Sequence, residues 1–300
     1  MSDILPGTVL VAGGDMRFAA LAAELSKNRR VYAAGFDRSA LSCDNCDKII
    51  AVDVMNIPER ADILILPMPV SDDGVTLCAP FYSGTIGLET LIGCVKEGGT
   101  VFGGRVTDKV RELFAKKGFS ITDYFLREEL SVLNAEATAE GAVQIALEEQ
   151  PRVIMGQRIL ILGMGRIAKA LIRVLSGFGA DITLCARKYS DLAWAKVYGC
   201  KSVHMRELKD SEALKSAELI FNTVPSLVLD EEHLKNCRSD SLIIDLASKP
   251  GGMDFEAAGR LGLRAIWALS LPGKTAPVSS GKIIGETIEN ILNERASGNF

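Results

Sequence analysis

The chain has 300 residues, of which 48% are hydrophobic, and its formal net charge is −4. A mildly acidic chain with 6% aromatic residues has no basic stripe or base-stacking surface, so we expect no nucleic-acid partner. No stretch approaches the roughly 20 consecutive apolar residues that cross a membrane. The N-terminus carries an acid where a signal peptide carries bases, so we expect a cytoplasmic protein with no membrane partner.

Short apolar runs alternate with amphipathic stretches from the start of the chain. In the first half we expect strands at 8–12, 30–34, 48–52, 62–66, 100–102 and 119–122, and helices at 16–26, 87–95 and 109–116. Residues 127–149 predict one long helix, with Pro151 just beyond it. In the second half we expect strands at 158–162, 181–185, 202–205, 218–221, 241–245 and 264–266, and helices at 166–177, 190–198, 255–260 and 281–295.

This alternation predicts an α/β protein with two Rossmann-like, doubly wound parallel-sheet domains joined by a long helix. We place an N-terminal Rossmann-like substrate or partner domain at 1–128, the linking helix at 129–151 and an NADP(H)-binding Rossmann domain at 152–278. The C-terminal helix, 279–300, is expected to cross back and pack on the first domain.

The seven cysteines have no regular spacing, which is typical of reduced thiols in a reducing compartment. Cys43 and Cys46 form one C-x-x-C pair. A structural zinc site needs four ligands, and the two histidines, His204 and His233, lie far away in sequence. We therefore expect two loop thiols and no metal site, with a metal or redox role for the pair as the alternative.

A dinucleotide fingerprint follows the strand at 158–162. It has the form G-x-G-x-x-A, in which Gly163 allows the tight turn, Gly165 lets the backbone approach a pyrophosphate, and Ala168 permits close helix packing. The N-terminus of the following helix supplies N–H groups for the phosphates. The alternative is a plain tight turn. From this segment we assign to the cofactor Gly163, Met164, Gly165, Arg166 and Ile167.

The end of the next strand distinguishes the two nicotinamide cofactors. NAD-specific sites usually place Asp or Glu there, whereas this chain has Arg187 and Lys188, with Asp181 at the opposite end of the strand. Paired basic side chains suit a 2′-phosphate. We therefore predict NADP(H), with NAD(H) as the second choice; a solvated basic turn is the other interpretation.

Further candidates follow other strands, where open α/β sheets bind ligands. We assign to the cofactor Asn222, Thr223, Val224, Pro225, Ala247 and Ser248. Lys274, in a loop expected at 269–277, is a catalytic candidate that could polarise a ring nitrogen or bind a carboxylate, although a surface lysine is as good an explanation. Glu136 on the long helix is the best proton carrier, and a solvated helix face is its alternative. The expected substrate contacts are Asp15, Arg17, Met68, Pro69, Ser83, Thr138, Pro272 and Gly273.

Six segments together resemble the A-subunit family of dipicolinate synthases of spore-forming bacteria. They are GGDMR (13–17), NAEATAEGAVQIALE (134–148), ILGMGRIAKAL (161–171), FNTVP (221–225), IDLASKPGG (244–252) and ALSLPGKTAP (268–277). The resemblance implies NADP-dependent aromatisation, in the mother cell, of a dihydrodipicolinate derived from hydroxytetrahydrodipicolinate. The product, dipicolinate, serves sporulation. The resemblance also implies a small dicarboxylate substrate and, as partner, the flavoprotein-like B-subunit of dipicolinate synthase; we further expect a homo-oligomer.

Two other functions fit the same architecture. One is a different NAD(P)-dependent two-domain dehydrogenase, similar to alanine dehydrogenase or methylenetetrahydrofolate dehydrogenase. The other is a nucleotide-binding subunit without chemistry of its own.

Overall fold

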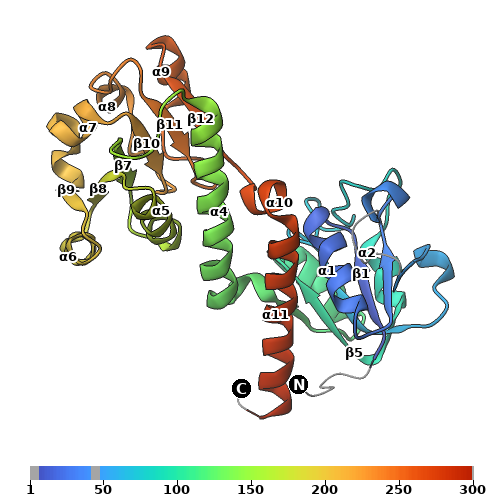
Figure 1. Cartoon of the computed structure of the whole chain (residues 1–300). Helices are drawn as coiled ribbons and strands as arrows, with labels where there is room; N and C mark the ends of the chain where they lie inside the picture. Colours follow the sequence, from blue (N-terminus) through green and yellow to red (C-terminus); the bar gives the residue numbers. More distant parts are fainter. Residues whose placement is uncertain (1–6, 42–47, 299–300) are drawn as a thin grey trace. The chain divides into compact units, whose positions relative to one another are not determined.

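The computed structural model describes residues 7–41 and 48–298, so the Cys43–Cys46 prediction lies outside the described residues. The chain divides into two compact units: unit 1 comprises residues 1–133 and 276–300, and unit 2 comprises residues 134–275. Each unit contains a six-stranded sheet, and every strand pair in both sheets is parallel. The predicted α/β fold class, with two Rossmann-like domains, is confirmed (Figure 1).

The sheet of unit 1 has the strand order β3-β2-β1-β4-β5-β6. Its strands are β1 (Val9–Ala12), β2 (Val31–Ala34), β3 (Ile49–Ala51), β4 (Ala61–Ile65), β5 (Val95–Gly103) and β6 (Ile121–Asp123). The helices are α1 (Met16–Ser26), α2 (Leu88–Gly93), α3 (Asp108–Lys116) and the C-terminal α11 (Pro277–Ala296). Two clusters of buried apolar side chains form the core of the unit. Central strands covered on both faces have continuous apolar sequences, as VLVA of β1 does.

Helix α11 packs against α1 although the two lie at opposite ends of the chain (Figure 1). A Cβ on Gly281 would lie 2.4 Å from the carbonyl oxygen of Arg17, so only glycine allows this close approach. Ile284 and Ile288 of α11 are buried in the same cluster as Leu21. Near its other end, Glu294 accepts two hydrogen bonds from the Arg127 guanidinium, at 2.6 and 2.7 Å.

The sheet of unit 2 has the order β12-β11-β10-β7-β8-β9, the same topology as in unit 1. Its strands are β7 (Arg158–Leu162), β8 (Asp181–Ala186), β9 (Lys201–His204), β10 (Leu219–Asn222), β11 (Leu242–Asp245) and β12 (Arg264–Trp267). The helices are α4 (Glu128–Glu149), which begins in unit 1, α5 (Arg166–Gly177), α6 (Tyr189–Val197), α7 (Glu212–Ser216), α8 (Glu231–Leu234), α9 (Phe255–Arg260) and α10 (Leu271–Thr275).

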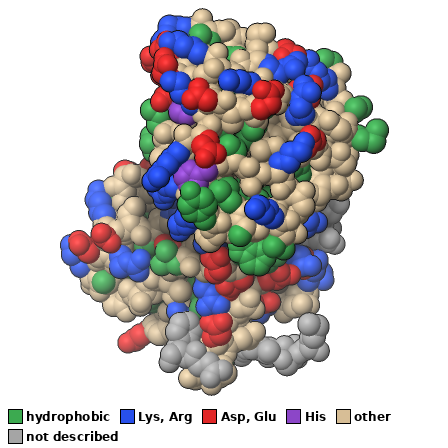
Figure 2. All heavy atoms as spheres, turned by 90° about the vertical axis from the view of Figure 1, so that its left-hand side faces the viewer, with side chains coloured by type: hydrophobic (Ala, Val, Ile, Leu, Met, Phe, Trp, Pro, Cys, Tyr) green, Lys and Arg blue, Asp and Glu red, His purple; other side chains and the backbone are tan. Residues whose placement is uncertain are grey.

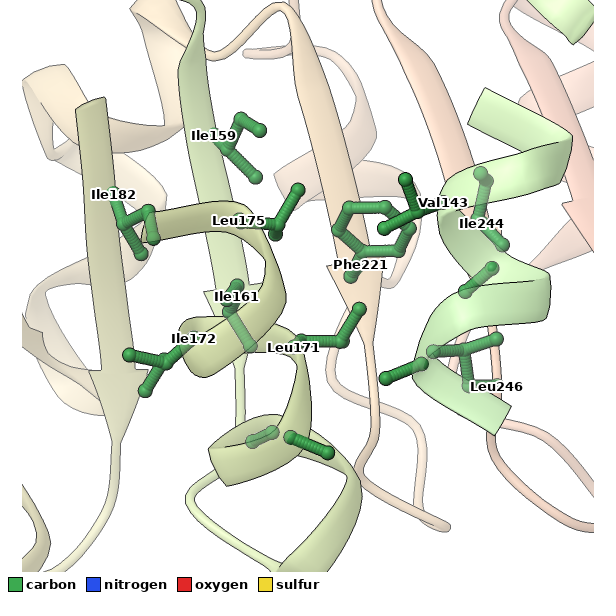
Figure 3. Packing of buried hydrophobic residues seen from close by; sticks show 14 of the residues in the cluster. Val143, Ile159, Ile161, Leu171, Ile172, Leu175, Ile182, Phe221, Ile244 and Leu246 are labelled. Atoms are coloured by element: carbon green, nitrogen blue, oxygen red, sulfur yellow. The ribbon is translucent and has the colours of Figure 1, made fainter. Parts of the chain in front are cut away.

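One face of the unit 2 sheet packs against α5 and α4. Figure 3 shows Ile161 of β7 and Phe221 of β10 beside Leu171 of α5, with Val143 of α4 near Phe221. This packing fixes where the turn between β7 and α5 lies.

The expected elements differ from the structure mainly at short segments. The helix α10 lies in the segment expected as a loop, α7 and α8 lie in segments for which no element was predicted, and β5 begins at Val95 rather than at residue 100. Helices of four or five residues carry no periodicity; α7 and α8 are each held by a side-chain cap, from Ser211 and from Asp230 respectively. None of the helices in the described part of the chain has the length and apolar character needed to cross a membrane.

Candidate dinucleotide site

The turn between β7 and α5 begins at Gly163, which the fold itself requires to be glycine. Its φ of +99° lies in the left-handed region, and a Cβ there would lie 2.5 Å from Thr223 Oγ1. Its N–H donates to the carbonyl oxygen of Cys185 at 2.8 Å, which joins the turn to β8. Gly163 therefore holds the turn close against the loop after β10.

Gly165, by contrast, is not required by any contact within the protein. It is exposed, has a φ of −78°, and a Cβ there would meet no atom within 4 Å. It occupies the N-cap position of α5, and no side chain caps the helix there. An open, uncapped start of a 12-residue helix fits a pyrophosphate, because free N–H groups and the helix dipole favour an anion.

The neighbours of Gly165 divide between core and surface. Ala168 is fully buried, which allows α5 to pack on the sheet as the fingerprint predicts. Met164 and Ile167 pack partly buried against the core, and the Arg166 side chain is exposed.

A buried polar network supports the loops after β10 and β11. Asn222 and Asp245 are the last residues of these strands, lie opposite each other in register, and are fully buried. Asn222 Nδ2 donates to Asp245 Oδ1 at 2.8 Å. The Asp245 carboxylate also accepts from the backbone N–H groups of Ala247 at 2.9 Å and Gly252 at 2.8 Å. A buried acid thus has three donors and fixes the loop at 247–252.

Asp245 was missed in the sequence analysis. The signal that could have found it is an acid ending an apolar strand whose neighbour ends in Asn222. Gly252 belongs to the same network, because a Cβ there would lie 2.1 Å from Asn222 Nδ2. Trp267 completes it by donating from Nε1 to the carbonyl oxygen of Ala247 at 2.9 Å.

The predicted cofactor residues of these loops have two kinds of environment. The side chains of Asn222 and Thr223 are used internally: Asn222 Oδ1 accepts from the N–H of Val224 at 3.1 Å, and Thr223 Oγ1 donates to the carbonyl oxygen of Leu162 at 2.7 Å. Pro225 and Ser248 are exposed, and Ala247 is buried. Their contact with a cofactor stays a prediction.

The carboxyl end of β8 carries exposed positive charge. Arg187 and Lys188 are both exposed, and neither side chain has a hydrogen-bond or ion-pair partner within residues 7–41 and 48–298. Asp181, at the opposite end of β8, pairs with Lys201 at 2.7 Å. Two unpaired cations without an adjacent strand-end carboxylate fit a 2′-phosphate better than a ribose hydroxyl.

The other candidates of unit 2 are placed separately. Glu136 of α4 forms an ion pair with Arg173 of α5, and this hydrogen bond raises the pKa of Arg173. Thr138 Oγ1 donates to the carbonyl oxygen of Asn134 at 2.9 Å. Lys274 is exposed on α10, beside the half-buried Gly273 and the buried Pro272. The catalytic assignments of Lys274 and Glu136 stay predictions.

The corresponding turn of unit 1 is closed by its own side chains. Asp15 caps α1, accepting from the Arg17 N–H at 3.1 Å, and the same carboxylate accepts from Arg17 Nε at 2.9 Å and Nη2 at 2.8 Å. Arg17 is only 8% exposed. Its Nη1 has no hydrogen-bond partner among the described residues. Every buried side-chain nitrogen of the described residues does have a partner, so Nη1 is not buried and reaches the surface.

The remaining substrate candidates of unit 1 follow β4. Met68 and Pro69 are half-buried, and the exposed Ser83 donates from Oγ to Asp37 at 3.2 Å. The structure thus joins Asp15 to Arg17 and gives Ser83 a separate partner. Among the residues that the structure describes, no three His, Cys, Asp or Glu side chains gather as a metal site would require.

Comparison with known proteins finds relatives that share these features. Residues 8–125 match the N-terminal domain of the dipicolinate synthase A-subunit, and residues 132–249 match the NAD-binding domain of D-isomer specific 2-hydroxyacid dehydrogenases. The dipicolinate synthase A-subunit of Bacillus subtilis (strain 168) is 28% identical over 95% of this chain and 96% of its own length. The chain is therefore similar to this A-subunit over nearly its whole length.

Two solved structures of dipicolinate synthase A-subunits are similar to this chain in fold and sequence. That from Bacillus halodurans has a TM-score of 0.83 at 25% identity and covers 95% of this chain and 97% of its own. That from Bacillus subtilis has a TM-score of 0.83 at 26% identity and covers 98% of each chain. The match to an NAD-binding dehydrogenase domain supports an oxidoreductase that uses a nicotinamide cofactor.

Proposed function

We propose that this chain oxidises a dihydrodipicolinate to dipicolinate with NADP⁺ as the hydride acceptor. The similarity to dipicolinate synthase A-subunits supports the dicarboxylate product. The observation that carries the oxidoreductase role is the open, uncapped turn at Gly165, because no contact within the protein explains a glycine there. The substrate would derive from hydroxytetrahydrodipicolinate, a precursor of lysine, and the product would serve sporulation.

The reaction removes a hydride and a proton from a dihydropyridine ring that carries two carboxylates. When bound, the cofactor accepts the hydride. We assign the carboxylates to cationic side chains: Lys274, which is exposed, and Arg17, whose Nη1 reaches the surface. Glu136, which forms an ion pair with Arg173, would receive the ring proton. Aromatisation is strongly downhill, so positioning matters more than a powerful base.

The choice of NADP⁺ rests on Arg187 and Lys188. Replacing Arg187 with Ala removes a charge-assisted contact to the 2′-phosphate, and we expect NADP⁺ binding to weaken by about tenfold while NAD⁺ binding is unchanged. Calorimetric titration with both cofactors measures this. Lys196→Ala, near the end of the following helix α6, is the matched control, because it removes an exposed positive charge away from the strand end. Equal weakening for both cofactors would contradict the NADP assignment.

We further propose that residues 1–128 form the substrate or partner domain, and that this chain works with the flavoprotein-like B-subunit in the mother-cell cytoplasm. Self-association into a homo-oligomer belongs to the same proposal. Co-purification of the two proteins tests the interaction with the B-subunit, and the mass of the assembly in solution tests self-association.

A turnover assay tests the proposed reaction. The purified chain is incubated with freshly generated hydroxytetrahydrodipicolinate and either NADP⁺ or NAD⁺, and the absorbances of pyridine dicarboxylate and reduced cofactor are followed together. We expect both to rise in step, and faster with NADP⁺. Turnover only after addition of the B-subunit would show that the isolated chain is not a complete enzyme. Cofactor binding without turnover under either condition would contradict the proposed substrate.

A further inference from the structure

Two aromatic rings meet at the carboxyl edge of the unit 2 sheet, next to the basic pair. His204 ends β9 and lies opposite Ala186, the last residue of β8. Tyr189 begins α6, and its ring centroid lies 5.0 Å from that of His204 with 33° between the planes. Tyr189 is 77% exposed. A tyrosine used only for packing would be buried, whereas this ring presents an open aromatic face to solvent.

The hydrogen bonds of His204 determine which ring nitrogen is available. Nδ1 accepts the backbone N–H of Arg206 at 3.2 Å and so caps the short helix that follows β9. The neutral ring therefore carries its hydrogen on Nε2. Nε2 has no hydrogen-bond partner among the described residues. Every buried side-chain nitrogen and oxygen of the described residues does have a partner, so Nε2 is not buried and this donor reaches the surface.

Three basic residues lie close to this ring pair in sequence. Arg187 and Lys188 directly precede Tyr189, and Arg206 lies two residues beyond His204; all three are exposed, and their side chains have no ion-pair partner in the described part of the chain. Carboxylates are also nearby in sequence, at Asp191 and Glu207. Figure 2 shows a face of the molecule on which basic, acidic and hydrophobic side chains lie beside histidine side chains.

We propose that Tyr189 and His204 form the adenosine end of the NADP site. Tyr189 offers its open face to the adenine ring, and His204 donates from Nε2 to the 2′-phosphate that Arg187 and Lys188 neutralise. The proposal rests on the proposed NADP-dependent function and adds to it one adenine-binding residue, Tyr189, and one specificity-determining residue, His204. An aromatic face binds any adenine nucleotide, whereas the histidine donor favours only the nucleotide that carries a 2′-phosphate.

Fragments of the cofactor separate the two roles. Binding of adenosine 5′-monophosphate and of adenosine 2′,5′-bisphosphate to the full-length protein is measured by calorimetry. We expect Tyr189→Ala to weaken the binding of both fragments by about tenfold. Tyr189→Phe keeps the ring and should leave the binding of both fragments unchanged. Tyr198→Ala is the matched control: Tyr198 is 43% exposed at the other end of α6, where it stacks on Trp194.

The histidine is tested without removing its cap. In His204→Asn the amide oxygen can still accept the Arg206 N–H, but the Nε2 donor is lost. We expect about tenfold weaker binding of the 2′,5′-bisphosphate and unchanged binding of the monophosphate. Wild-type affinity of Tyr189→Ala and His204→Asn for both fragments, with intact NADP⁺ binding, would overturn this inference and leave the proposed function standing. A wild-type protein that binds neither fragment nor either cofactor would overturn the proposed function itself.

Discussion

The two units share one sheet topology, yet their first strand-to-helix turns differ in what fills them. In unit 1, a Cβ on Gly13 would lie 2.7 Å from Leu77 Cδ2, and one on Gly14 would lie 2.3 Å from Phe18 Cδ2. Asp15 then caps α1 with its carboxylate. In unit 2, Gly165 has open space around it and α5 has no side-chain cap.

This difference shows that the fold alone does not create a nucleotide site. Where the protein's own atoms fill the space that a Cβ would occupy, the glycine is needed for the fold. A glycine that faces open space at a helix start leaves room for a ligand. In unit 1 the Asp15 carboxylate also occupies the position where a phosphate would need N–H donors, and it would repel the phosphate charge.

The largest expected effect comes from giving unit 2 the turn chemistry of unit 1. Gly165→Asp places a carboxylate at the proposed pyrophosphate position, and we expect NADP⁺ binding to weaken by at least about a thousandfold. The unfolding midpoint should stay unchanged or rise slightly, because Asp is a preferred N-cap residue and a Cβ there meets no atom. Calorimetry and thermal unfolding measure the two effects.

Gly259→Asp is the control for that change. It adds the same charge in unit 2 at another exposed glycine with no atom within 4 Å of its Cβ position. Nucleotide binding that survives Gly165→Asp would mean that the turn at 163–166 does not hold the phosphates.

The turn of unit 1 should respond in the opposite way. Gly14→Ala forces a side chain into a φ of +94° and against the fully buried Phe18, so we expect the free energy of unfolding to fall by about 3 kcal/mol. Nucleotide affinity should not change. Denaturant unfolding and titration measure both, and Gly93→Ala, with no atom within 4 Å of its Cβ position, is the control. A loss of nucleotide affinity in folded Gly14→Ala would break the contrast between the turns.

A smaller effect is expected from the network behind the unit 2 turn. Asp245→Asn keeps the shape of the side chain and an acceptor for Asn222, but its amide group faces the N–H of Gly252. Two donors facing each other in a fully buried site should cost about 2 kcal/mol of stability. Chemical denaturation gives this value. An unchanged unfolding free energy would show that the network does not fix the loop at 247–252.

The smallest effect concerns the helix that covers α1 in unit 1. The hydrogen bond from Arg127 lowers the pKa of Glu294. A carboxyl with a lowered folded-state pKa adds stability above its unfolded pKa of about 4.3 and loses it as the pH falls through the folded value. Glu294→Gln should therefore lower the unfolding midpoint slightly at neutral pH, with no difference once the carboxyl is protonated. A pH series of thermal unfolding tests this against Glu286→Gln, and a difference that persists in acid would contradict the ion-pair explanation.

Secondary structure follows from the sequence most closely where burial is continuous. β7 and α5 have the predicted bounds, 158–162 and 166–177, because strands covered on both faces and amphipathic helices leave clear patterns. The hydrogen bonds between Asp15 and Arg17 could not be predicted, since an acid at a strand end has the same sequence pattern whether it binds a ligand or a neighbouring side chain. Asp245 and the Tyr189–His204 pair depend on strand register, which brings together residues far apart in the chain.

The most direct test of the account is a calorimetric titration of the full-length protein with NADPH. We predict one nucleotide per chain, with binding lost in Gly165→Asp and retained in Gly14→Ala. Two nucleotides per chain, or binding that Gly165→Asp leaves intact, would contradict the claim that only the turn of unit 2 holds the cofactor.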